Sequence, residues 1–159
     1  MSKGFCAAEE GHVVLLLAPR GTTTTIALTS DTINMENWAH ATILVAGGIG
    51  SGTTAITVGE CVGFGGTSRT AIAFRYAKED ETGGDVLDAA LAWGTTASLG
   101  GTAGVFIVIE IDADELSDGY NFLQVNFSAN IAAEARDLCC FAILSGGRYQ
   151  EDITATVIA

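Results

Sequence analysis

A glycine-rich stretch, GGIGSGTT at residues 47–54, is the first place where the residue types suggest chemistry. Gly47 and Gly52 stand five apart, as in the phosphate-binding loop G-x-x-x-x-G-K-[ST]. That loop needs a lysine that reaches the phosphates and a helix whose amide groups face the anion. Thr53 occupies the lysine position, and the residues after it are β-branched and alternate in polarity. The stretch therefore predicts two strands joined by a glycine-rich hairpin turn rather than a nucleotide site.

Residue types that bind metals are few and scattered. Neither of the two histidines, His12 and His40, has a Cys, His or carboxylate neighbour at metal-ligand spacing. His40 stands in an apolar stretch, which predicts a partly buried structural histidine. The acidic stretch DADELSDG at 112–119 lacks the third ligand and the flanking helices of an EF-hand. We expect a solvated acidic turn there, no metal and no cofactor; a divalent ion bound at 112–118 in an assembly is the open alternative.

Hydrolytic chemistry has no signature in the chain. The nucleophile pattern G-x-S-x-G is absent. Glu60 and Glu110 lie in apolar segments, but nothing singles them out as the carboxylate pair that a glycosidase needs. A strand glutamate is expected to face solvent or to pair with an arginine such as Arg69, Arg75 or Arg136. The sequence thus indicates a protein that is not an enzyme.

The charge balance limits the possible partners. The chain has 159 residues, with 19 acidic and 7 basic side chains and a formal net charge of −12. Nucleic acids and anionic membranes repel such a chain, so neither is expected as a partner. Charged residues make up only 16% of the chain, below the roughly 25% of ordinary soluble domains. Part of the surface is therefore expected to be covered by a partner or by other copies of the chain.

The order of apolar residues is that of an all-β protein. Short apolar or alternating runs are separated by Gly, Asp, Asn and Ser, without a capped helical pattern of ten residues or more. The expected strands, spaced as in a sandwich or jelly roll, are 12–18, 22–28, 38–46, 53–61, 69–76, 103–111, 120–128 and 137–144. The stretch 85–93 is ambiguous between a strand and a helical turn, and 78–85 is an acidic loop.

A single domain is expected, because no linker divides the chain. Its parts are an N-terminal arm at 1–11, an antiparallel β-sandwich or jelly roll of about eight strands at 12–150, and a tail or short edge strand at 151–159. Adjacent Cys139 and Cys140 are expected on opposite faces of a strand, one in the core and one half-exposed. No stretch approaches 18 apolar residues, so no membrane span is expected.

Four segments, taken in order, resemble a known group of proteins. They are WAHATILVAGGIGSGTTAITV, TAIAFRY, GVFIVIEIDADELSDGYNFLQVNFS and FAILSGGRY, which span roughly residues 34–149. They resemble small structural proteins encoded beside the capsid genes of tailed bacteriophages. The resemblance implies a β-sandwich or jelly-roll head protein that acts as a decoration, cement or minor capsid component, and it implies no catalytic residue.

The expected function follows from this resemblance together with the composition. We expect the chain to be made in the host cytoplasm, to bind the exterior of the virion capsid and to stabilise the shell by bridging copies of the major capsid protein. Self-association, most simply as a homotrimer, would bury the remaining apolar surface. The predicted partner-binding residues are Phe5, His12, Arg20 and Trp93. The alternative is a head-fibre or surface carbohydrate-binding jelly-roll module that uses Trp93 as a sugar platform.

Overall fold

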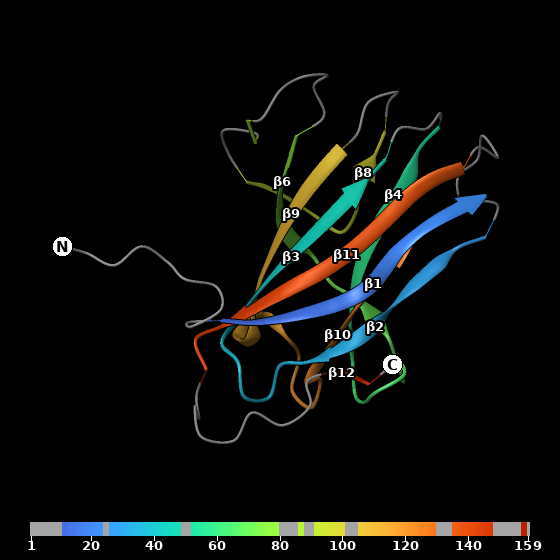
Figure 1. Ribbon diagram of the computed structural model, residues 1–159. Coiled ribbons are helices and arrows are strands. Elements are labelled where there is room, and N and C mark those ends of the chain that lie inside the picture. Colours follow the sequence, from blue (N-terminus) through green and yellow to red (C-terminus); the bar gives the residue numbers. More distant parts are fainter. Residues whose placement is uncertain are drawn as a thin grey trace.

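The structure is a computed structural model, and it describes residues 11–23, 26–48, 52–79, 86–87, 91–100, 105–129, 135–147 and 157–158. Its elements are strands and one short 3-10 turn, η1 (Figure 1). They are β1 (Gly11–Thr23), β2 (Leu28–Asn34), β3 (His40–Gly47), β4 (Thr54–Cys61), β5 (Thr70–Ala71), β6 (Phe74–Glu79), β7 (Ala92–Gly94), β8 (Ala97–Leu99), β9 (Val105–Asp112), η1 (Ala113–Glu115), β10 (Phe122–Phe127), β11 (Ala135–Ser145) and β12 (Val157–Ile158). The all-β prediction is confirmed, and eight of these strands have six residues or more.

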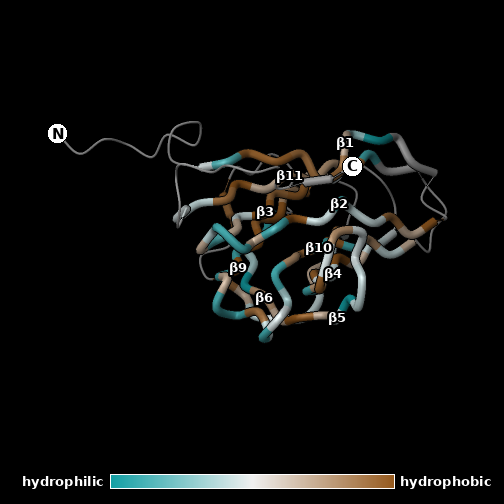
Figure 2. The backbone as a smooth tube through the Cα atoms, turned by 90° about the horizontal axis from the view of Figure 1, so that it is seen from below, coloured by the Kyte–Doolittle hydropathy of each residue, from teal (hydrophilic) through white to brown (hydrophobic). Residues whose placement is uncertain are grey.

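The strands form two antiparallel sheets that pack face to face (Figure 2). Sheet A has the order β1-β11-β3-β9-β6-β7, and sheet B has the order β12-β2-β10-β4-β5, with β8 also paired to β4. The chain alternates between the sheets from β1 to β4 and again from β9 to β11. It also crosses between β5, which pairs with β4, and β6, which pairs with β9. The four-strand layers β1-β11-β3-β9 and β2-β10-β4-β5 are those of a jelly roll, as expected.

The glycine-rich stretch at 47–54 does not close a hairpin. β3 pairs with β11 and β9 in sheet A, whereas β4 pairs with β10, β5 and β8 in sheet B. The predicted hairpin between 38–46 and 53–61 is therefore wrong, and the connection crosses from one sheet to the other. Gly52 has a φ of 80°, the left-handed conformation that glycine adopts freely. Such a residue serves a crossing as well as a hairpin turn, so the sequence does not distinguish them.

The first strand is longer than the sequence predicted. β1 continues through Pro19, where the sequence predicted its end, to Thr23. Its register with β11 shifts between Leu15 and Leu17 and again between Leu17 and Arg20. Pro19 is tolerated because β1 is the edge strand of sheet A, so the missing N–H removes no bond from the interior of the sheet.

Two other predicted segments differ from the structure. The strand expected at 22–28 is wrong, because β2 begins only at Leu28 and runs to Asn34. The strand expected at 69–76 is divided into β5 and β6, the point at which the chain changes sheets. In the ambiguous stretch 85–93, Val86, Leu87 and Leu91 are outside any strand, and β7 begins at Ala92.

The core lies between the two sheets and is filled by alternate residues of their strands. Its largest fully buried side chains are Phe74, Phe127, Leu16, Ile33, Ile43, Ile56, Leu99, Ile107, Ile109, Ile111 and Leu123. Cys140 is fully buried and Cys139 is half-buried, so the prediction for this pair is confirmed. Burial raises the pKa of the Cys140 thiol, which keeps it protonated. In the part of the chain that the structure describes, no helix is long and apolar enough to span a bilayer.

Adjacent residues of β3 test this placement of the core. Ile43 is fully buried between the sheets, whereas Leu44 points to the outer face of sheet A and is half-buried. We expect Ile43→Ala to lower the free energy of unfolding by about 2–5 kcal/mol, because it leaves a cavity. Leu44→Ala should cost about 1 kcal/mol or less, because less apolar area is lost from a buried setting. Urea unfolding of dilute protein measures both, and equal losses would contradict the two-face assignment.

Candidate functional site

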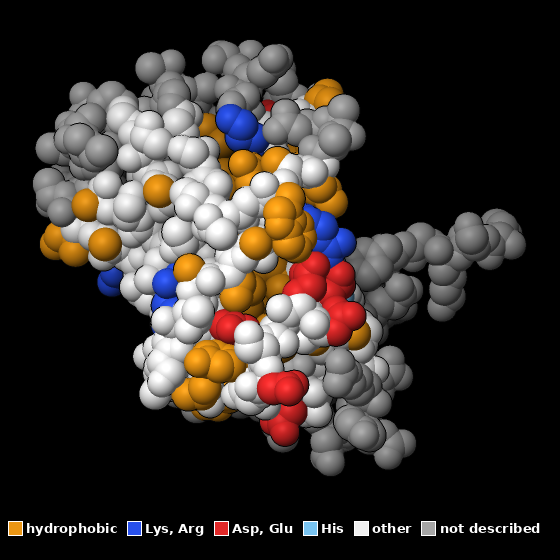
Figure 3. Space-filling view, turned by 180° about the vertical axis from the view of Figure 1, so that it is seen from behind, with side chains coloured by type: hydrophobic (Ala, Val, Ile, Leu, Met, Phe, Trp, Pro, Cys, Tyr) orange, Lys and Arg blue, Asp and Glu red, His pale blue; other side chains and the backbone are white. Residues whose placement is uncertain are grey.

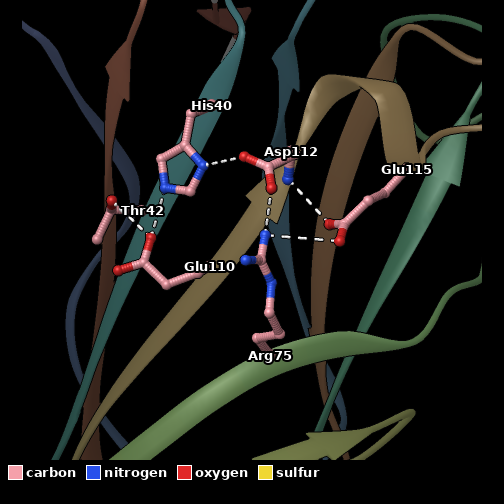
Figure 4. A network of polar contacts seen from close by, with 6 residues as sticks. All are labelled: His40, Thr42, Arg75, Glu110, Asp112 and Glu115. Carbon is pink, nitrogen blue, oxygen red and sulfur yellow. Dashed lines mark hydrogen bonds and ion pairs between the residues drawn. The ribbon is translucent and has the colours of Figure 1, made fainter. Parts of the chain in front are cut away.

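Among the residues that the structure describes, a concentrated group of ionisable side chains lies at one end of sheet A, where β3, β9, β6 and η1 meet (Figure 4). The register places His40 opposite Asp112, and Glu110 opposite Arg75 on the other side of β9. Glu110 and Asp112 share a face of β9 because side chains two residues apart point the same way. Strand pairing thus brings together residues that are far apart in the sequence.

His40 is held between two carboxylates. Its Nε2 lies 2.6 Å from Glu110 Oε2, and its Nδ1 lies 2.6 Å from Asp112 Oδ1. An ionised carboxylate only accepts hydrogen bonds, and a neutral imidazole donates from one nitrogen only. Both contacts together therefore require the imidazolium form. Partial burial of the ring opposes this charge, but the hydrogen bonds and negative charges of Asp112 and Glu110 outweigh it and raise the pKa of His40 above 6.5.

A second set of contacts extends the cluster to β6 and η1. Arg75 donates from Nη2 to Asp112 Oδ2 and lies 3.5 Å from Glu115 Oε1. The Asp112 backbone N–H donates to Glu115 Oε2 at 2.9 Å, so Glu115 also caps the 3-10 turn. The hydrogen bond from His40, opposed by partial burial and reinforced by Arg75, holds the pKa of Asp112 below its usual value. We call these five side chains the ion-pair cluster: His40, Arg75, Glu110, Asp112 and Glu115.

The geometry of the ion-pair cluster favours a structural role. Both ring nitrogens of His40 are occupied, so neither offers a lone pair to a metal ion or a substrate proton. The carboxylate of Asp112 bonds His40 and Arg75, which leaves it poorly placed as the first ligand of a Ca²⁺ ion at 112–118. Among the described residues, no group of three or more His, Cys, Asp or Glu side chains has the arrangement of a metal site. The cluster fastens β3, β9, β6 and η1 together.

Of the predicted partner-binding residues, Trp93 stands opposite Arg75 of this cluster, whereas His12 and Arg20 are on β1 at the other edge of sheet A. His12 stacks on Trp38, with ring centroids 5.7 Å apart and planes 12° from parallel. Arg20 is exposed on β1. Trp93 is 61% exposed on β7, at the opposite edge of sheet A from β1. Phe5 lies outside the described residues.

The sequence marks His40 and Glu110 as unusual separately, but it does not show that the two side chains are in contact. Glu110 was expected to face solvent or to pair with an arginine, but it accepts hydrogen bonds from His40 and, at 2.8 Å, from the hydroxyl of Thr42. Glu60 was expected to behave similarly, and it is instead buried, where it accepts a hydrogen bond from the backbone N–H of Ser117 at 2.8 Å. The sequence contains one sign of this site, the acids that alternate with isoleucines in IEID at 109–112 and therefore share one face of a strand. The strand that pairs with this segment and supplies His40 cannot be identified from the sequence.

No family model, curated protein or solved structure matches the chain.

The ion-pair cluster makes stability depend on pH. The folded-state pKa of His40 is raised, so its stabilising contribution is complete below pH 6.5 and is lost as the pH rises through that higher pKa. We expect the free energy of unfolding of the wild type to fall over this range. His40→Gln should remove the part of this pH dependence that comes from His40. The variant should therefore lose most stability, relative to the wild type, at the acidic end of the pH range.

His12→Gln is the matched control, because the chain has only these two histidines. This variant should keep the pH dependence of the wild type. Chemical unfolding between about pH 5.5 and 9 measures the difference, and a ¹H NMR titration of the His40 ring measures its pKa directly. A pH dependence that survives His40→Gln and disappears in His12→Gln would refute the assignment.

Proposed function

We propose that this chain is a structural protein of a tailed-bacteriophage head, a decoration or cement protein that binds the exterior of the shell and bridges copies of the major capsid protein. The resemblance over residues 34–149 supports this function. The structural observation that favours it most is β1, a strand of 13 residues at the edge of sheet A. It lies within residues 1–30, the part of the chain that we expect to grip the lattice.

β1 has the properties of a strand that pairs with another chain. One side of it bonds β11, and no strand pairs with its other side among the residues described. Val13 and Leu15 are 54% and 56% exposed on it. Long apolar edge strands are rare in isolated proteins because they pair with strands of other molecules. A strand added by a capsid subunit would form main-chain hydrogen bonds here, and many copies would add their contributions over the shell.

The charge of the chain supports a position on the outside of a head. The net charge of −12 repels packaged DNA and favours a basic protein surface. The ion-pair cluster supports a role in which the sandwich transmits force, because it joins three strands and a turn at one end of sheet A. Assembly as a homotrimer is part of the proposal, since closed symmetry lets each copy contribute its arm to a shared site.

The exposure of Trp93 supports a second candidate function, a carbohydrate-binding jelly-roll module on a head fibre. Trp93 stands opposite Arg75 in the β6–β7 pair, at the edge of sheet A that is remote from β1. An exposed indole is the side chain that commonly stacks on a sugar ring. Trp38, by contrast, is only 8% exposed, so a change in fluorescence on glycan binding would come from Trp93.

Copy number on purified particles tests the decoration function. We expect this chain in amounts comparable with the major capsid protein, because a lattice-bound protein occupies each repeat of the shell. Quantitative mass spectrometry of particles provides the measurement. A handful of copies, or none, would contradict a decoration function and favour the fibre module.

Rebinding to particles that lack the chain tests the mode of attachment. Phe5→Ala should weaken binding about tenfold or more, because a phenylalanine that becomes buried contributes about 1.5–3 kcal/mol. Trp93→Ala is the control and should bind the shell as the wild type does. The thermal unfolding midpoint of each variant shows whether it has folded. Equal binding by wild type and Phe5→Ala, or loss of binding only in Trp93→Ala, would overturn this mode of attachment.

A further inference from the structure

The outer face of sheet A is apolar over four neighbouring strands, β1, β11, β3 and β9, which Figure 1 shows side by side. A register row across these strands contains Leu15 on β1, Phe141 on β11, Leu44 on β3 and Val108 on β9. The rows on either side of it add further apolar residues. We call the whole set the apolar field: Val13, Leu15, Leu44, Ala46, Phe106, Val108, Cys139, Phe141 and Ile143.

This face is unusual for an antiparallel sheet that meets solvent. Such a sheet normally alternates apolar residues toward the core with polar residues toward water. In β3, by contrast, Leu44 points outward between Ile43 and Val45, which are fully buried. Figure 2 shows the result as continuous hydrophobic colour along much of β1, β11 and β3. An apolar pattern on both faces is that of a sheet covered on both sides.

The size of the apolar field is a large share of the apolar part of a protein interface. Its nine positions, each about 4.8 Å by 6.7 Å, give it a planar area of about 290 Å². A stable interface takes about 800 Å² from each partner, and a little over half of that area is apolar, about 450 Å². The apolar field therefore supplies about two-thirds of the apolar area that one partner needs, and Thr42 and Glu110 beside it supply part of the polar rim.

Charge distinguishes between the possible occupants. The apolar field contains no charged residue, so a basic partner gains nothing by binding there. The neighbouring charges of the ion-pair cluster already bond one another, and with His40 protonated its three acidic and two basic side chains leave one net negative charge. Seen from behind, the molecule has several groups of acidic side chains, which lie beside hydrophobic and basic ones (Figure 3). Two copies at −12 each would meet with least repulsion on this face.

We propose that the apolar field is an interface between two copies of this chain, packed sheet A against sheet A about a two-fold axis. Flat sheet faces pack on flat sheet faces, about 10 Å apart, with their side chains interdigitated. A two-fold contact uses the same surface on both partners, so one apolar field covers the other. This contact goes beyond the attachment to a shell proposed above and does not depend on it. The homotrimer would need a separate contact.

Sedimentation velocity over a range of concentrations tests the proposal with purified full-length chain. The wild type should form dimers. Leu44→Lys, which places a charge at the centre of the apolar field, should weaken dimerisation at least tenfold, because the charge would be buried without a partner. Val108→Lys on the neighbouring strand should do the same, and it replaces Leu44→Lys if that variant fails to fold. Thr70→Lys is the matched control, since the same charge change stands on an exposed strand of sheet B.

Each outcome decides the proposal. Dimers in the wild type and in Thr70→Lys, with monomers in a folded Leu44→Lys or Val108→Lys, would support it. A wild type that is monomeric at every concentration would overturn it. Dimers or trimers that persist unchanged in the lysine variants would also overturn it, because the contact would then lie elsewhere. None of these results bears on whether the chain binds a shell.

The thiol of Cys139 gives an independent measurement on the same face. Cys61 and Cys140 are buried in the core, and Cys6→Ser removes the only cysteine outside the described residues. In that variant, Cys139 is the one thiol at the surface of the sandwich. Its reaction with a thiol reagent should slow at least tenfold between concentrations at which the protein is monomeric and dimeric. A rate that does not change while dimers form would overturn the proposal.

Discussion

The register between β3 and β9 is the constraint on which the rest of this molecule depends. Neighbouring side chains along a strand point to opposite faces, so a slip of one residue would exchange the two faces of sheet A. In the observed register, Ile43 and Ile109 pair on the core face, while Leu44 and Val108 pair on the outer face. The same register sets His40 opposite Asp112. The core, the apolar field and the ion-pair cluster are thus three consequences of one alignment.

The ion-pair cluster also helps to hold that alignment. A slip by one residue would separate His40 from both carboxylates and leave partly buried charges without partners, which is costly. Apolar contacts alone specify the register less well, because sheet A is apolar on both faces and many slipped pairings would still place apolar residues together. A polar contact at one end therefore supplies the specificity that the apolar strands lack.

Sheet B covers only one of the two faces of sheet A. Sheet B covers the inner face, so the jelly roll is complete as a single chain. The outer face keeps a row of apolar residues over β1, β11, β3 and β9. The low charge content of the chain is explained by this second apolar face, because residues that would ordinarily be charged on the solvent side of a strand are aliphatic or aromatic here.

Sequence patterns predicted what depends on neighbouring residues. Val58 and Val125, in the alternating stretches that form β4 and β10, are fully buried, and the adjacent pair Cys139 and Cys140 was correctly divided between the two faces. The same patterns gave wrong predictions where the outcome depends on which strands pair with each other. The glycine-rich crossing at 47–54 has the composition of a hairpin turn, and Pro19 resembles a strand end until β1 is known to be an edge strand.

By itself, then, the sequence determined the all-β class, the approximate positions of most long strands and, where polar and apolar residues alternate as in β4, which side of the strand is apolar. These features follow from local periodicity, which the order of residues expresses directly. Only the tertiary structure decided which strands share a sheet, which acids meet His40 and whether an apolar side chain faces the core or the outside. Those outcomes depend on pairings between residues far apart in the chain, such as Gly11 with Ser145, and a local pattern is the same whichever partner is chosen.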